Sequence, residues 1–170
     1  MPNVSEDSLH RLNALCGEAL CWAQMFEQEI FNSILLHALV RGLVVSRDDV
    51  EELLNKKYKK KALRHKLNEI FQRIGTEPDL RHTLYEALEK RNTFVHDLFW
   101  EHAELLSTEH GREQLIPKAR GYAELFRTAF QIARNVTALY AAQANNAEIQ
   151  KAFNVTSGRN PPDAAFKIQS

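Results

Sequence analysis

An apolar seam near the start of the chain constrains the fold more than any other feature of the sequence. Its members recur at alternating spacings of three and four, and they are Leu9, Leu12, Cys16, Ala19, Ala23, Phe26, Ile30, Ser33 or Ile34, and His37. This spacing places one face of a long α-helix against other helices. Ser5 with Ser8 is expected to cap the helix, and Gly42 stands where it should stop.

Three further helices are predicted along the chain. The second follows Ser46 and stops at Gly75, and the third opens at Thr76-Glu77-Pro78 and continues to about Trp100. The third is expected to bury Leu80, Leu84, Leu88 and Val95. After a connector over 104–111, the fourth helix is expected to bury Leu115, Ala119, Tyr122, Phe126, Ala129, Ala133, Val136 and Tyr140.

These four helices predict an all-α fold, an up-and-down four-helix bundle with a short C-terminal extension. We expect the bundle to occupy residues 1–145 and the extension, residues 146–170, to be exposed or partly disordered. Only 6 glycines and 5 prolines interrupt the 170 residues, and breakers this scarce favour long helices over the many turns of a β-sandwich.

The charge balance limits the classes of partner. Lys plus Arg number 22 and Asp plus Glu number 22, so the formal net charge is zero. A dedicated duplex-DNA binder usually carries a strong basic excess, because phosphate neutralisation dominates such binding. Any nucleic-acid binding by this chain must therefore be local.

Targeting signals are not evident in the sequence. The first residues lack a basic start followed by an apolar run, and the longest uncharged apolar stretch, Ile30 to Val40, is too short to span a membrane. Cys16 and Cys21 do not form a CxxC pair, so we expect two buried free thiols in a reducing compartment. These observations predict a cytoplasmic protein without membrane contact.

The segment EKRNTFVHDLFW, residues 89–100, carries the chemistry in the predicted third helix. Asn92 and His96 are four apart, so the amide could hydrogen-bond the imidazole and fix its tautomer. Arg91 and His96 are five apart, or about 140° around an ideal helix. They can converge on one phosphate only if the helix ends or kinks there, or if a second subunit supplies a second pair. This requirement predicts a symmetric homodimer with the motif at its two-fold axis.

These residue types suit RNA cleavage without a metal or cofactor. The imidazole of His96 can take the proton from a ribose 2′-OH or protonate the leaving oxygen. The guanidinium of Arg91 can stabilise the charge that develops on the phosphate oxygens. The products would be a 2′,3′-cyclic phosphate and a 5′-hydroxyl, and DNA should resist because it lacks the 2′-OH.

The RN-x-x-x-H string, late in the third helix of a small helical bundle, resembles the signature of the HEPN superfamily. Many members are dimeric, metal-independent endoribonucleases of toxin–antitoxin, phage-defence and RNA-processing systems. The resemblance implies that Arg91 and His96 are catalytic, with Asn92 as the polar residue beside the arginine. It also implies Glu27, in CWAQMFEQEI, as an auxiliary polar group and a nucleotidyltransferase-like antitoxin as a cognate partner. Asp97 departs from the pattern, because a carboxylate there could repel phosphate.

A basic run on the second helix, KKYKKKALRHK, offers a second candidate site. An RNA backbone could follow its cations, with Tyr58 stacking on a base; the candidate residues are Lys57, Tyr58, Lys60, Lys61 and Arg64. A solvated basic face is the commoner outcome of such a run.

Two alternatives to the nuclease hypothesis remain, and a separate question concerns the aromatic pair after the motif. Arg91 and His96 could serve a catalytically silent HEPN-like module for RNA binding, dimerisation or partner regulation. His96-Asp97 also invites comparison with metal-dependent HD phosphohydrolases, but the only aspartate after Asp97 is Asp163, in the predicted extension. Phe99 and Trp100 are expected to anchor the core or a dimer interface rather than to stack on bases.

Overall fold

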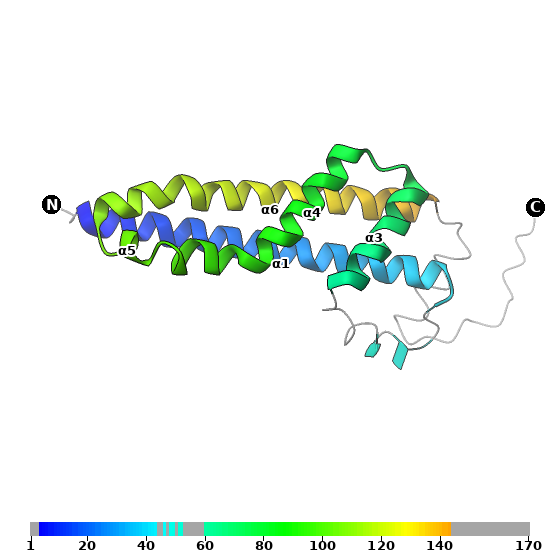
Figure 1. The fold of residues 1–170 in the computed structure, drawn as a ribbon. Coiled ribbons are helices and arrows are strands. Elements are labelled where there is room, and N and C mark those ends of the chain that lie inside the picture. Colours follow the sequence, from blue (N-terminus) through cyan, green and yellow to red (C-terminus); the bar gives the residue numbers. More distant parts are fainter. Residues whose placement is uncertain (1–3, 44–45, 47, 50, 53–59, 144–170) are drawn as a thin grey trace, which may run out of the picture. The chain divides into compact units, whose positions relative to one another are not determined.

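The computed structural model describes residues 4–43, 46, 48–49, 51–52 and 60–143. Its helices are α1 (Val4–Val40), α3 (Lys60–Ile74), α4 (Pro78–Val95), α5 (Ala103–Leu106) and α6 (Glu109–Gln143), with a π-helix, η1 (His96–Trp100), between α4 and α5 (Figure 1). No strand occurs within the described ranges, which confirms the all-α prediction. The predicted extension, 146–170, lies outside them.

The chain divides into two compact units. Unit 1 consists of Met1–Ile30 and Thr76–Asn135, and unit 2 consists of Phe31–Gly75 and Val136–Ser170. The two longest helices, α1 and α6, contribute to both units. Helix α4, η1 and α5 belong to unit 1, whereas α3 belongs to unit 2.

The predicted seam of α1 is buried except at its first position. All its members from Leu12 to His37 are 5% exposed or less. Leu9 is 43% exposed, and Ser8 is buried in its place. The hydroxyl of Ser8 accepts a hydrogen bond from Nε of Arg112 on α6, at 3.0 Å. Capping by Ser5 with Ser8 is therefore wrong, because α1 already begins at Val4; the Ser8 side chain instead joins α1 to α6.

Helix α6 buries every residue that its spacing predicts, from Leu115 to Tyr140. Helix α4 does not: Leu80 is 40% exposed and Leu88 is only half-buried. The buried residues of α4 and η1 are Leu84, Ala87, Phe94 and Leu98. A regular alternation of three and four between Ala87 and Phe94 passes through Arg91, so a charged residue occupies one position of the buried seam.

The glycine and proline signals at the ends of α3 and α4 hold, whereas the predicted connector does not. Gly75, with φ of +67°, ends α3, and Pro78 opens α4 as predicted. The predicted connector over 104–111 is partly wrong, because Ala103–Leu106 is helical and α6 already begins at Glu109. Gly111 lies inside α6 at a close approach, where an added Cβ would overlap the backbone of Leu105. Its role is therefore packing rather than turning the chain.

The two cysteines differ in burial. Cys16 is buried, and burial raises the pKa of its thiol to about 11. Cys21 is exposed, so the expectation of two buried thiols is wrong for this residue. None of the described helices contains a stretch apolar enough to cross a membrane.

A buried histidine joins three helices of unit 2. The Nδ1 atom of His37 lies 2.8 Å from the Tyr140 hydroxyl, and its Nε2 atom lies 2.9 Å from the Glu69 carboxylate. The guanidinium of Arg73 donates to the same Tyr140 oxygen at 3.0 Å. Burial lowers the pKa of His37 below its ordinary 6.5; Glu69 opposes this shift, and Arg41 and Arg73 reinforce it.

We expect His37 to make unit 2 sensitive to acid. Because the pKa of His37 is lower in the folded than in the unfolded chain, the unfolded state binds the proton first as the pH falls below about 6.5. The stability that the neutral imidazole contributes is present above that pH and is lost below it. In urea unfolding followed by circular dichroism, the stability difference between wild type and His37→Gln should shrink as the pH falls from 8 to 5. A difference that is constant over this range would contradict the prediction.

Candidate functional site

Arg91 is half-buried on α4 and points toward α1. Its NH2 group donates to the carboxylate of Glu27, and its NH1 group donates to Oδ1 of Asn92 at 3.0 Å. The Arg91 and Glu27 side chains are 32% and 24% exposed, so water reaches both in part. These two bonds use two of the five N–H donors that a guanidinium carries. The structure thus brings together Arg91, Asn92 and the predicted auxiliary residue Glu27.

The amide of Asn92 is engaged at both ends. Its oxygen accepts from Arg91, and its nitrogen donates to the carbonyl of Leu88, one helical turn earlier, at 2.8 Å. The predicted hydrogen bond from Asn92 to the imidazole of His96 is therefore wrong. The side chain orients the guanidinium instead of the histidine.

His96 marks the place where the helix geometry changes. It is the first residue of η1, and its carbonyl accepts from the amide of Glu101, five residues later, at 3.2 Å. The exposed imidazole lies with Nδ1 at 3.8 Å from the Glu101 carboxylate, rather than against Arg91. The helix thus departs from α geometry at the predicted histidine. Short π-helical turns of this kind occur frequently at functional sites.

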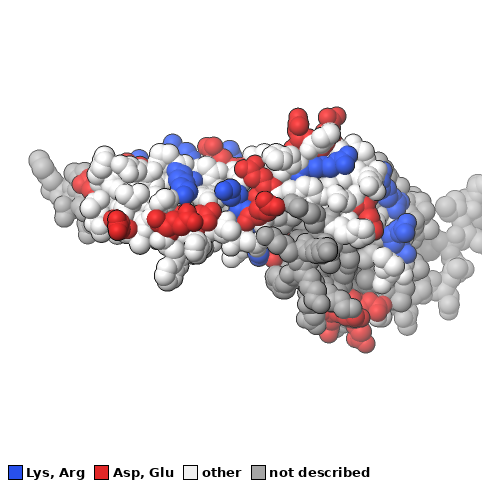
Figure 2. Space-filling model, viewed as in Figure 1, with Lys and Arg blue, Asp and Glu red and all other residues white. Residues whose placement is uncertain are grey.

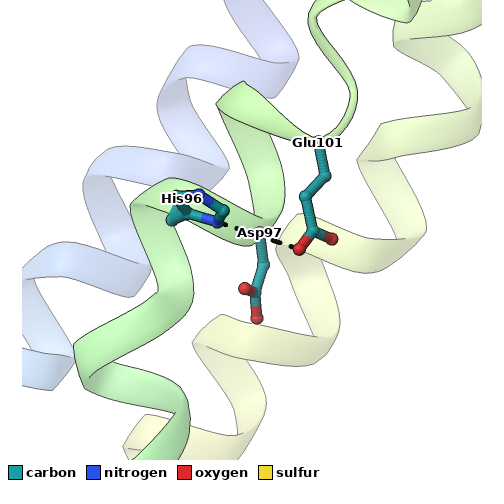
Figure 3. A group of neighbouring side chains, drawn as sticks. All are labelled: His96, Asp97 and Glu101. Atoms are coloured by element: carbon teal, nitrogen blue, oxygen red, sulfur yellow. Dashed lines mark ion pairs between the residues drawn. The ribbon is translucent and has the colours of Figure 1, made fainter.

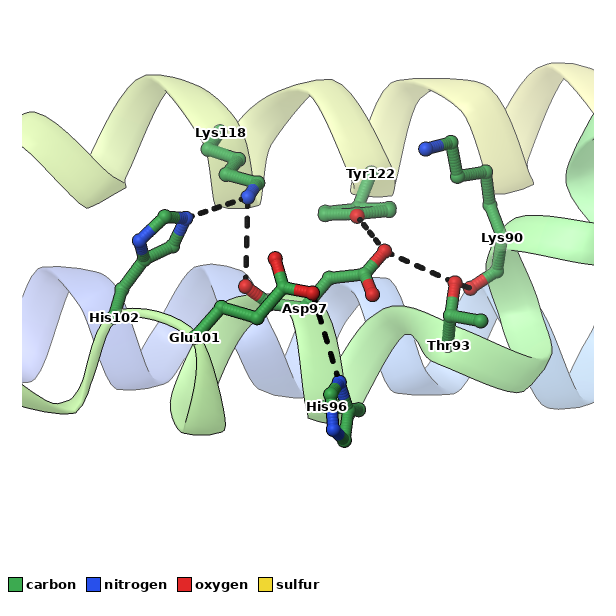
Figure 4. A network of polar contacts seen from close by, with 8 residues as sticks. All are labelled: Lys90, Thr93, His96, Asp97, Glu101, His102, Lys118 and Tyr122. Atoms are coloured by element: carbon green, nitrogen blue, oxygen red, sulfur yellow. Dashed lines mark hydrogen bonds and ion pairs between the residues drawn. The ribbon is translucent and has the colours of Figure 1, made fainter.

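The carboxylate of Asp97 turns toward α6. Its Oδ2 atom accepts from the Tyr122 hydroxyl at 2.9 Å and from the Thr93 hydroxyl at 3.0 Å (Figure 4). Burial alone would raise the pKa of Asp97, but these two hydrogen bonds, with nearby Lys90 and Lys118, hold it below its ordinary value. Burial and the Asp97 carboxylate together raise the pKa of Tyr122 to about 12.

Two residues at the start of η1 and one directly after its end resemble a metal-ligand set. The donor atoms of His96, Asp97 and Glu101 lie within 4.8 Å of one another (Figure 3). An imidazole with two carboxylates suits several divalent metals. However, one oxygen of Asp97 already accepts two hydrogen bonds, and exposed acidic groups commonly gather without a metal. The cluster by itself does not establish a metal site.

Several polar residues around η1 were not predicted from the sequence as part of the site. Lys118 on α6 donates to Nε2 of His102 at 2.7 Å and to the carbonyl of Asp97 at 3.4 Å (Figure 4). Tyr122 was predicted only as a core residue, and Glu101 was not singled out. The available signal was a tyrosine at a predicted core position, because its hydroxyl needs a partner when buried.

The last three residues of η1 differ in burial. Leu98 is fully buried, Phe99 is half-buried, and Trp100 is 76% exposed. Trp100 therefore does not anchor the core of its own chain. The interface alternative stays a prediction for this residue.

The predicted RNA-binding run lies only partly within the described chain. Lys57 and Tyr58 are outside the described residues. Lys60, Lys61 and Arg64 lie in α3, in unit 2, whereas Arg91 and His96 belong to unit 1. On the face drawn in Figure 2, acidic and basic side chains of the described residues are interspersed, with no single basic patch.

Comparisons with protein-family models, with curated proteins and with solved structures found no match to this chain. The likeness to HEPN proteins therefore depends on Arg91, Asn92 and His96 and on the helical architecture in which they lie.

Proposed function

We propose that the chain is a HEPN-type, metal-independent endoribonuclease that acts as a homodimer in the cytoplasm. The observation that carries the proposal is the placement of Arg91 and His96 in one unit, one held by Glu27 and the other at the first residue of a π-helix. The Arg91 and Glu27 side chains are 32% and 24% exposed, and the partial burial of such a pair carries a desolvation cost.

The proposed reaction needs one base, one acid and one cationic donor. His96 removes the proton of the ribose 2′-OH, and the resulting oxygen attacks the adjacent phosphorus. The bond from phosphorus to the 5′-oxygen breaks, and an imidazolium returns a proton to that oxygen. Arg91 donates to the non-bridging oxygens as their charge grows. The products are a 2′,3′-cyclic phosphate and a 5′-hydroxyl.

A second copy of the chain completes this site in the proposal. The imidazole of His96 lies beside Glu101 and the guanidinium of Arg91 beside Glu27, so one chain does not pair the two groups directly. Two chains related by a two-fold axis would supply one histidine as base and one as acid. By the same resemblance, we propose that a nucleotidyltransferase-like antitoxin acts as a regulatory partner.

Incubation of the purified protein with RNA tests the proposed chemistry. We expect cleavage to persist in excess EDTA, to leave cyclic phosphate and 5′-hydroxyl ends, and to vanish when every ribose is replaced by deoxyribose. The ends are identified by mass spectrometry, and the deoxy oligonucleotide of the same sequence is the matched control. Cleavage that EDTA abolishes would favour the His96, Asp97 and Glu101 group as a metal site. Protein that binds RNA without cutting it would favour the catalytically silent module.

A further inference from the structure

We propose that Asp97 is a positioning residue, which clamps the π-helix to α6 and thereby holds His96 where the reaction requires it. The inference deepens the proposed function and rests on it. Asp97 itself is not assigned any contact with RNA. It is the residue that departs from the HEPN pattern, so the role follows from its contacts in this chain.

Three bonds converge on Asp97 from two helices. The Tyr122 hydroxyl of α6 and the Thr93 hydroxyl of α4 both donate to Oδ2, at 2.9 and 3.0 Å. The ammonium of Lys118, also on α6, lies 3.4 Å from the Asp97 carbonyl oxygen. Side chain and main chain of one residue are thus tied to the same neighbouring helix (Figure 4). These contacts fix the first turn of η1 at the residue that directly follows His96.

The aromatic core makes the Tyr122 hydroxyl a fixed donor. Tyr122 is 7% exposed, and its ring packs against Phe94 at 4.8 Å and against Phe126 at 6.0 Å between centroids. A ring held on two sides leaves its hydroxyl little freedom to follow a moving acceptor. Asp97 must therefore meet the hydroxyl at one place, and η1 is anchored there.

His96 needs such an anchor because its own side chain has little to hold it. The imidazole is 68% exposed, and its charged neighbour, Glu101, is 3.8 Å away. Its position is consequently set by the backbone of η1. A π-helical turn is uncommon, and it persists where the surrounding structure stabilises it. The clamp supplies that stabilisation through the adjacent residue.

The ionisation of Asp97 agrees with a clamp. Two donated hydrogen bonds hold the pKa of its carboxyl below the ordinary value, so it remains an acceptor at neutral pH. A group in this state is unsuited to donate a proton to a leaving oxygen. The carboxylate is suited to accept the bonds that the geometry shows.

Amide hydrogen exchange tests the clamp independently of activity. In Tyr122→Phe, which removes one oxygen and keeps the packed ring, the Glu101 amide should exchange about fivefold faster, as expected for the loss of one hydrogen bond. Thr93→Val is the second variant, in case Tyr122→Phe does not fold. Thr83→Val is the matched control, because its hydroxyl donates to the Asp79 carbonyl on α4, at 3.1 Å. Unchanged exchange at Glu101 in both test variants would overturn the proposal.

Kinetics test whether the clamp acts on His96. We expect Tyr122→Phe to lower kcat about tenfold and to leave KM unchanged, because RNA binding does not use the clamp. Asp97→Ala should lose at least as much, whereas Asp97→Asn, which keeps an acceptor oxygen for Tyr122, should recover most of the kcat. Equal losses in Asp97→Asn and Asp97→Ala would show that only the negative charge matters and would overturn the clamp.

The outcomes separate this inference from the proposed function. If the wild type cuts RNA and kcat stays unchanged in Tyr122→Phe while exchange at Glu101 accelerates, the positioning role alone is wrong. If the wild type cuts no RNA under any condition, the proposed function fails and the positioning role fails with it.

Discussion

Replacing His96 with alanine is expected to lower kcat for RNA cleavage by about 10²- to 10⁴-fold, the range that a general acid–base group contributes. The fold should survive, because the imidazole is 68% exposed and lies 3.8 Å from the Glu101 carboxylate. KM should change little, since the imidazole acts on a proton rather than on binding. Steady-state kinetics with a short fluorogenic RNA measure both constants.

The matched control for His96→Ala is His82→Ala, an exposed histidine on α4, the helix that directly precedes η1. His82→Ala should retain the wild-type rate, and circular dichroism should show the same helix content in both variants. A wild-type rate in His96→Ala would refute the catalytic assignment. A large loss in His82→Ala as well would point to a general effect on α4 rather than to acid–base chemistry.

Arg91 needs a different design, because it also has a structural neighbour. Its removal leaves the carboxylate of Glu27, which is 24% exposed, without the guanidinium that it contacts. Loss of activity in Arg91→Ala alone would therefore confuse catalysis with stability. In the Glu27→Gln background the charge problem is removed, so the additional effect of Arg91→Ala reports on the reaction. Glu27 is thus the ion-pair partner that the design must neutralise before Arg91 is removed.

The long helices were predictable because their signal is repeated many times. In α1 and α6 the apolar positions recur over about seven or eight turns, at 3.6 residues per turn, and a single error such as Leu9 does not shift the register. The end of α3 and the start of α4 were also predictable. Gly75 and Pro78 act through their own backbone conformations and do not depend on distant neighbours.

The face of α4 was not predictable by counting apolar residues. Its buried seam passes from Ala87 through Arg91 to Phe94, and a search for apolar residues skips an arginine and selects Leu88 instead. The arginine is tolerated there because Glu27 on α1 meets it, and nothing local in the sequence announces that pairing. Arg91, which the motif predicts to be functional, is thus also the residue that made the prediction of the buried face wrong.

The sequence predicts the residues of the candidate site, which stay a prediction, but not their geometry. Spacing singles out Arg91, Asn92 and His96, whereas the direction of the Asn92 amide depends on the nearby Leu88 carbonyl and Arg91 guanidinium. The π-helix carries no compositional signal, since a change from i+4 to i+5 pairing can occur with ordinary residues. Tyr122 and Lys118 reach Asp97 from another helix, and only the packing of α6 on η1 brings them there.

Replacing Trp100 with glutamate is expected to weaken the proposed homodimer by about 30-fold or more, the effect of losing an aromatic anchor worth about 2 kcal/mol. Trp100 is 76% exposed and lies four residues after His96 in the same five-residue π-helix. In the proposed homodimer a second copy of the chain would cover this exposed ring, and tryptophan is enriched at such interfaces. Analytical ultracentrifugation over a range of protein concentrations measures the dissociation constant.

Cleavage should follow the dimer in this variant, because each proposed site needs two chains. The specific activity of Trp100→Glu should be low in dilute solution and should rise toward the wild-type value as the protein concentration increases. Leu80→Glu is the matched control, since Leu80 is a 40% exposed apolar residue of α4 in the same unit. An intact dimer with a raised KM would instead assign Trp100 to stacking on an RNA base, where each base contributes about 1–3 kcal/mol. An intact dimer with unchanged kinetics would remove Trp100 from both roles and would leave the two-chain site without an anchor at η1.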